Sequence, residues 1–139
     1  MTSLGAVRTA LKGRLEVISG LRVYDLWPEQ VNVPCAIIMP PESGQFAEHQ
    51  LTFTGDLSRY SLEILVLVQF GTLRSAQTEA DALLSATSTG SIHGALDADR
   101  TLGGVVHYVN VLPLREYGTI PANGLEYFGA VVPVEVWAG

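Results

Sequence analysis

The sequence has 139 residues, of which 47% are hydrophobic and 16% charged, and its 14 acidic and 8 basic residues give a net charge of −6. This length and apolar content predict one folded domain with a hydrophobic core and exclude a disordered chain. The basic residues are scattered singly, which argues against a surface for nucleic-acid backbones. The single Cys35 excludes an internal disulfide and a cysteine-based zinc site.

Membrane and export signals are not evident in the sequence. It has no run of about 18 apolar residues that could span a membrane, and its N-terminus does not have the pattern of a signal peptide. We therefore expect no membrane association and a protein that stays in the cytoplasm where it is made. The low charge content also suggests that other subunits cover part of the apolar surface.

The N-terminal region predicts a helix followed by two short strands. Thr2 or Ser3 can cap the helix, Gly20 can end it, and its apolar residues recur at three- and four-residue steps at Leu4, Val7, Leu11, Leu15 and Ile18. Residues 21–26 and 34–39 read as strands that end at Trp27-Pro28 and Pro40-Pro41. Cys35 is expected to pack in the second strand as a small hydrophobic residue.

Residues 42–56 predict a projecting arm or long hairpin, because they are polar, weakly patterned and longer than an ordinary connection. A short strand at residues 51–54 is expected to pair with the start of the next strand. The apolar side chains of this arm would then need cover from elsewhere, and they are Phe46, Leu51 and Phe53.

Residues 60–70 predict the central strand of the sheet. Every even position is apolar, and the middle of the odd face, Leu65 and Leu67, is apolar as well. Alternation of this kind marks one buried face, and the apolar middle of the other face indicates cover on both sides.

The C-terminal half predicts a second helix and two further long strands. The helix is capped by Thr72, and its expected buried stripe is Leu73, Ala76, Ala80, Leu83 and Leu84. One more helical turn is expected at residues 91–95. The strands are expected at residues 105–115 and 125–137, joined by a loose hairpin tip at 117–124. The first strand's expected face is Val106, Tyr108, Leu112 and Leu114; the second's is Phe128, Ala130, Val132, Val134 and Val136.

Together these elements predict an α+β fold in one domain over residues 1–139. We expect a mostly antiparallel twisted sheet of about four to five strands, with two main helices packed on one face. Long strands with projecting loops and little charge are typical of a subunit that its neighbours complete.

The sequence predicts no catalytic, cofactor-binding or metal site. His49, His93 and His107 do not have metal-ligand spacing. Ser91, His93, Asp97 and Asp99 lie close together in sequence, but no Gly-x-Ser-x-Gly elbow accompanies them. Residues 97–104 (DADRTLGG) predict a turn in which the aspartates accept backbone N–H bonds, Arg100 pairs with one of them, and Gly103-Gly104 adopts positive φ.

The order of these elements resembles the tail terminator, or tail completion, proteins of long-tailed bacteriophages. After the amphipathic N-terminal helix, the resemblance rests on the segments VYDLWPEQVNVPCAIIMP, YSLEILVLVQF, SAQTEADALL, DADRTLGGVV and YFGAVVPVEVWA. It covers nearly the whole chain.

The resemblance implies an assembly role in the virion tail, with assembly in the host cytoplasm. Such a subunit would form a homo-hexameric ring. The ring would cap the tail tube, stop polymerisation of the major tail tube protein, and contact the head-completion or connector protein. DNA would pass through the channel without specific binding. The expected contact segments are 42–56 and 117–124, and the residues nominated in them are Phe46, His49, Leu51, Phe53, Tyr117, Ile120 and Asn123.

Two other functions remain open from the sequence. The chain could be a neighbouring head–tail connector or minor tail protein. In a different class, it could be a small enzyme or ligand-binding α+β domain that uses His93 with Asp97 in a convergent pocket.

Overall fold

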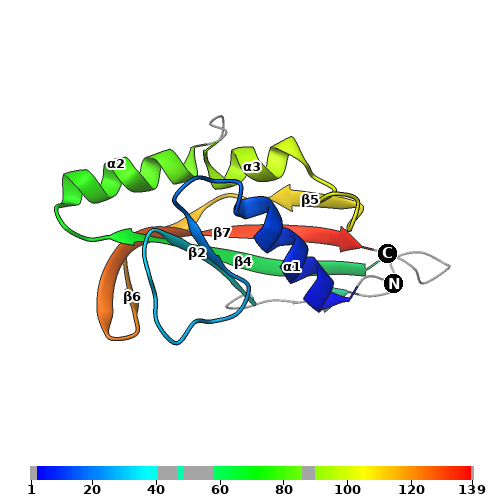
Figure 1. The fold of residues 1–139 in the computed structure, drawn as a ribbon, viewed down its shortest axis with the longest axis horizontal. Helices are drawn as coiled ribbons and strands as arrows, with labels where there is room; N and C mark the ends of the chain where they lie inside the picture. The colour runs from blue at the N-terminus through cyan, green and yellow to red at the C-terminus, as the bar shows by residue number, and fades with distance from the viewer. Residues whose placement is uncertain (1–2, 41–46, 49–57, 86–89, 139) are drawn as a thin grey trace.

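The computed structural model describes residues 3–40, 47–48, 58–85 and 90–138. Helices and strands alternate irregularly along the chain (Figure 1), in the order α1 (Leu4–Leu15), β1 (Arg22–Tyr24), β2 (Cys35–Met39), β3 (Ala47–Glu48), β4 (Ser58–Gln69), α2 (Leu73–Leu84), α3 (Ile92–Ala98), β5 (Tyr108–Val111), β6 (Arg115–Ala122) and β7 (Leu125–Ala138).

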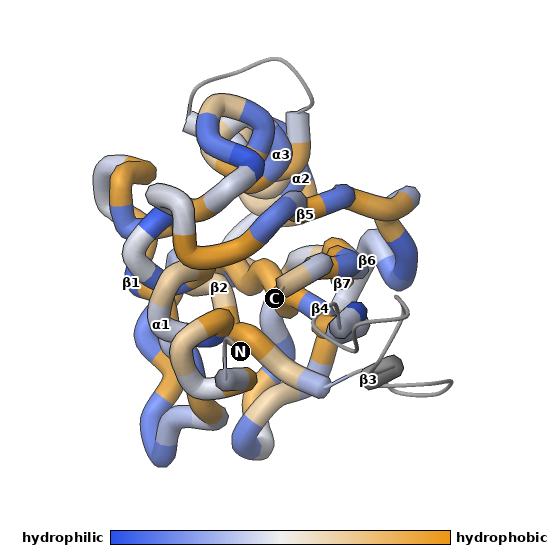
Figure 2. Tube along the Cα trace, turned by 90° about the vertical axis from the view of Figure 1, so that its right-hand side faces the viewer, coloured by the Kyte–Doolittle hydropathy of each residue, from blue (hydrophilic) through white to orange (hydrophobic). Residues whose placement is uncertain are grey.

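All strands of the described residues belong to one sheet with the order β1-β2-β4-β7-β5, in which β3 pairs with β4 and β6 with β7. Among the strands that the structure describes, only the β1–β2 pair is parallel. Residues of all three helices join one face of this sheet in a single apolar core, and Figure 2 shows α2 and α3 together on that side. The predicted α+β class and mostly antiparallel sheet are confirmed. The described sheet has more strands than the four to five expected, since β3 and β6 were not expected as strands.

The centre of the sheet is the pair formed by β4 and β7, which are in register from Ser58↔Ala138 to Gln69↔Tyr127. Tyr60, Leu62, Ile64, Val66 and Val68 of β4 belong to the core under the helices, whereas Leu65 and Leu67 belong to a second cluster on the opposite face. This confirms the predicted central strand with cover on both faces. Each fully buried aliphatic side chain here stabilises the fold by roughly 1.5–3 kcal/mol.

Helix α1 forms where the sequence predicts it and ends earlier. The Ser3 side chain accepts a hydrogen bond from the Ala6 N–H at 3.1 Å, which caps the helix. Val7, Leu11 and Leu15 are fully buried, as the apolar stripe predicts. The helix ends at Leu15, however, and Ile18 is buried from the turn that follows rather than from the helix. A chain can bury an apolar side chain without extending its helix, which periodicity alone does not show.

Helix α2 buries three residues of its predicted stripe. Ala76 and Ala80 are fully buried, and Leu83 is 8% exposed. The expected stripe is wrong at Leu73, which is 54% exposed. Leu73 is the first residue of α2, and Figure 1 shows the start of this helix at one end of the molecule.

The single strand predicted over residues 105–115 is wrong, because the chain divides there into β5 and β6. Strand β5 ends at Val111, opposite Val134, and β6 begins at Arg115, opposite Val131. The change of partner occurs opposite Pro133, whose carbonyl accepts from the Leu112 N–H at 2.9 Å. The nitrogen of Pro133 faces the same side of β7 as its carbonyl and has no hydrogen to donate. This position without a donor therefore lies opposite the gap between β5 and β6, where no strand residue needs it.

This division also changes the predicted faces and the hairpin. The expected face of the 105–115 strand is confirmed at Val106, which is buried, but it is wrong at Tyr108, which is 42% exposed while the neighbouring Val109 is 1% exposed. The predicted loose tip at 117–124 is mostly strand, and the turn is confined to Asn123 and Gly124, with φ of 50° and 80°. Positive φ at both central residues is the geometry that Asn-Gly hairpin turns favour. For β7 the predicted face is confirmed, since its members are all buried, namely Phe128, Ala130, Val132, Val134 and Val136.

Strands β2 and β3 lie along the same edge of β4 with extra chain between them. From Met39 to Ala47 the chain advances eight residues, while the partner positions move three, from Glu63 to Tyr60. Apart from residues 47–48, the predicted arm at 42–56 lies outside the described residues, as does the short strand expected at 51–54.

Cys35 is completely buried in the second cluster, which confirms its expected role as a small hydrophobic residue. Burial raises the pKa of its thiol to about 11. Because the thiolate is the reactive form, we expect iodoacetamide at pH 8 to alkylate Cys35 far more slowly in the native protein than in urea. Mass spectrometry over time measures both rates, and equal rates would show that the site opens readily.

Candidate interaction surface

The face of the sheet opposite the helices carries an apolar groove of about 460 Å³. Loop, strand and hairpin residues line it, namely Trp27, Met39, Pro40, Glu63, Leu65, Glu116, Ile120, Pro121 and Val131. Leu65 and Val131, both nearly buried, come from the central strands, while Trp27 is 49% exposed. A half-exposed tryptophan beside buried aliphatic side chains is typical of a surface that binds a partner.

One acidic side chain of the groove lining forms an ion pair. Glu63 of β4 is 7% exposed and forms a salt bridge with Arg115, the first residue of β6. Glu63 and Arg115 are on strands that do not pair with each other, since β7 lies between them. The Arg115 side chain therefore ties β6 to β4 across β7.

Glu116 follows Arg115 in an irregular part of β6. The β6–β7 register shifts between Arg115 and Gly118, and Glu116 has φ of 57°. Such a bulge re-aims side chains and is a common feature beside functional sites. Glu116 is exposed and lies in the groove lining, so it adds a second acidic side chain to the groove.

The three nominated interface residues that the structure describes lie in different places. Ile120 lines the groove, and Asn123 at the hairpin turn donates from Nδ2 to the Glu29 carbonyl at 3.4 Å. Tyr117 lies elsewhere: its hydroxyl donates to Asp81 Oδ1 of α2 at 2.7 Å, and its ring meets Phe128 edge-on at 5.1 Å. The other nominated residues lie outside the described residues, and they are Phe46, His49, Leu51 and Phe53.

The Asp81 carboxylate raises the pKa of Tyr117, mainly because the hydrogen bond favours the protonated phenol. This bond connects β6 to α2 on the helical side of the sheet. Tyr117 is nevertheless 47% exposed. Its described contacts thus hold two elements of one subunit together, while part of its ring stays accessible.

His93 lines a separate pocket of about 310 Å³ whose other lining residues are apolar or proline. Asp97, its suggested partner, is one turn along α3 and forms a salt bridge with Arg100. Ser91 caps α3, accepting from the Gly94 N–H at 3.0 Å, and is fully buried. The serine and the aspartate of the hydrolase alternative therefore both have structural partners.

The predicted turn at residues 97–104 is confirmed from Asp99 onward, whereas Asp97 lies in the last turn of α3. Asp99 accepts from the Gly103 N–H and from Thr101 Oγ1, each at 2.9 Å. Arg100 pairs with Asp97, and its guanidinium lies over the Tyr108 ring at 5.1 Å. Gly103 and Gly104 have φ of 73° and 89°. These contacts fix the path from α3 to β5.

The carboxylate of Asp99 gives this turn a defined pH dependence. The hydrogen bond from the Thr101 side chain, followed by that from the Gly103 N–H, lowers the pKa of Asp99 below its ordinary value of 3.8. A lowered folded-state pKa contributes stability that is present above 3.8 and is lost as the pH falls through the folded value. We expect Asp99→Ala to be less stable than the wild type near neutral pH, with the difference narrowing in acid. Urea titrations across pH measure it, and a constant difference would contradict this origin.

Sequence reasoning missed most of the groove. It treated Trp27 only as the end of a strand and did not single out Glu63. One signal was present: Glu63 is an acid among otherwise apolar residues of the strand's middle. A lone charge at such a position requires a partner, although the sequence does not show that the partner is Arg115.

Among the described residues, no group of three or more histidine, cysteine, aspartate or glutamate side chains could hold a metal ion. No helix in the described ranges is long and apolar enough to cross a membrane. A scan against models of known protein families found no match. A search of curated proteins likewise found none.

Proposed function

We propose that this chain is a structural subunit of a phage tail that assembles into a ring, caps the tail tube and joins the tail to the head connector. The observation that carries the proposal is the apolar groove on the sheet face opposite the helices, with Trp27 half exposed at its side. A subunit that is completed by neighbouring copies needs such a surface.

Two further features support the proposal. The order of elements resembles that of tail terminator proteins, and the α+β architecture agrees with it. The net charge of −6 also suits a ring whose channel lets DNA pass without gripping it.

The test measures the oligomeric state in solution and images the protein with tail tubes. Sedimentation velocity of the purified chain, and negative-stain imaging of it with tail tubes of a long-tailed phage, should show rings alone or rings at tube ends. A strictly monomeric chain that neither binds nor caps tubes contradicts the proposal. If the chain belongs instead to a neighbouring connector or minor tail position, its location in a disassembled virion will be away from the tube end.

The pocket beside His93 favours one alternative of a different class, a small ligand-binding domain. His93→Ala would then abolish ligand binding without changing assembly. The ring-forming subunit predicts no such loss, so the same variant distinguishes the two functions.

A further inference from the structure

We propose that the groove binds the N-terminal end of α2 from a second copy of this chain, which gives a head-to-tail contact. This inference rests on the proposed function, which requires copies to associate, and adds the surfaces by which they do so. The α2 end is defined here by Phe70, Leu73 and Arg74.

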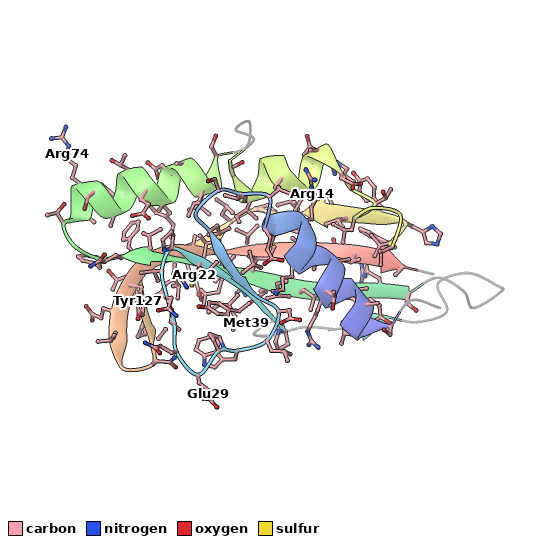
Figure 3. All side chains as sticks on the ribbon, viewed as in Figure 1. Arg14, Arg22, Glu29, Met39, Arg74 and Tyr127 are labelled. Carbon is pink, nitrogen blue, oxygen red and sulfur yellow. The ribbon has the colours of Figure 1, made fainter. Side chains whose placement is uncertain are left out.

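The α2 end combines exposed apolar side chains with positive charge. Phe70 is 39% exposed, with its ring 6.1 Å from that of Phe128, and Leu73 is 54% exposed. Figure 3 shows Arg74 extending away from the body of the protein. The first turn of α2 contains no acidic residue, so the positive end of the helix dipole adds to the charge of Arg74.

The groove offers the complementary combination. Its walls are mostly apolar, and its charged members are Glu63 and Glu116. Arg115 already neutralises Glu63, which leaves Glu116 as the acid available to an incoming base. Within the described part of the chain, neither Glu116 nor Arg74 has a charged partner. An apolar contact flanked by an unpaired acid and an unpaired base fits an arginine-bearing partner.

The two surfaces cannot meet within one subunit. Phe70 packs against Phe128 of the core under the helices, whereas the floor of the groove, Leu65 and Val131, belongs to the cluster on the opposite face of the sheet. A contact between two different surfaces of identical chains is heterologous, and it produces a ring when its rotation closes. The same geometry produces an open filament when the rotation does not close.

Charge exchange tests the contact directly. Arg74→Glu and Glu116→Arg should each weaken self-association at least about tenfold, because each places like charges together. The double variant Arg74→Glu/Glu116→Arg carries the exchanged pair at every contact and should recover most of the wild-type association. Trp27→Ala should also weaken self-association, and adding Arg74→Glu or Glu116→Arg to it should not restore that association. The controls are Arg22→Glu and Glu29→Arg, which change the same charges at exposed sites outside both surfaces.

Sedimentation velocity over a concentration series gives the association constants, and thermal melting shows that each variant is folded. Recovery in the double variant supports the contact. Single swaps that leave a wild-type ring intact overturn this contact but not the proposed function, since another surface then forms the ring. If the double variant recovers self-association but forms open filaments that do not bind tail tubes, the contact is supported and the proposed function is contradicted.

One further outcome overturns the contact, namely a wild-type chain that stays monomeric at the highest concentration it tolerates.

Discussion

Replacing Gly129 by alanine is expected to destabilise the folded chain by about 3 kcal/mol or more. A Cβ atom at this position would lie 1.7 Å from the Val66 carbonyl oxygen and 2.8 Å from its carbonyl carbon. The obstacle is the backbone of β4, which is itself held by β2 on its other side. The strand cannot move away without breaking a second row of hydrogen bonds, so the methyl group has to be accommodated by distorting the centre of the sheet.

Urea denaturation compared with the wild type measures this loss. The matched control is Gly13→Ala in the middle of α1, where an added Cβ would meet nothing within 4 Å. That change should stabilise the protein by about 1 kcal/mol, because alanine is the better helix former. An alanine at position 129 that leaves the urea midpoint unchanged would show that β4 and β7 are further apart than described.

Removing the positive partner of Glu63 has the second largest expected effect. Arg115→Met should cost about 2 kcal/mol of unfolding free energy at neutral pH, because it leaves a carboxylate that is 7% exposed without its salt bridge. We expect a smaller loss of unfolding free energy than for a fully buried ion pair, because the Arg115 side chain is 37% exposed and water already weakens its interaction with Glu63.

A double-mutant cycle separates the pair from its members. Glu63→Leu combined with Arg115→Met replaces the ion pair by apolar side chains and should recover most of the loss, as such replacements of buried pairs often do. Chemical denaturation of all four proteins gives the interaction free energy. Strictly additive losses would indicate that the two side chains stabilise the fold independently.

Periodicity predicted the central elements because burial dominates them. The alternation in β4 and β7 and the stripe of Val7, Leu11 and Leu15 each reflect one face turned toward a single core. The turn at residues 97–104 was also predictable, since aspartate and glycine determine its geometry locally.

The remaining features depend on which elements meet. The break between β5 and β6 lies opposite Pro133 of the neighbouring strand, and a sequence does not show which residues of two strands lie opposite each other. The exposure of Leu73 depends on where α2 ends relative to the rest of the molecule. The groove gathers Trp27, Glu116 and Leu65 from three separate segments, so no local pattern marks it.

The change of neighbour along β7 divides the sheet into two parts that can open separately. Strand β5 holds residues 134–137 of β7, and β6 holds residues 125–131. The hairpin formed by β6 and residues 125–131 of β7 is therefore expected to open separately from the half that β5 holds, which keeps its amides protected from solvent deuterium. The contacts that resist this opening are the Arg115–Glu63 ion pair and the Tyr117–Asp81 hydrogen bond, so they set how far the hairpin can adapt its shape to a bound molecule.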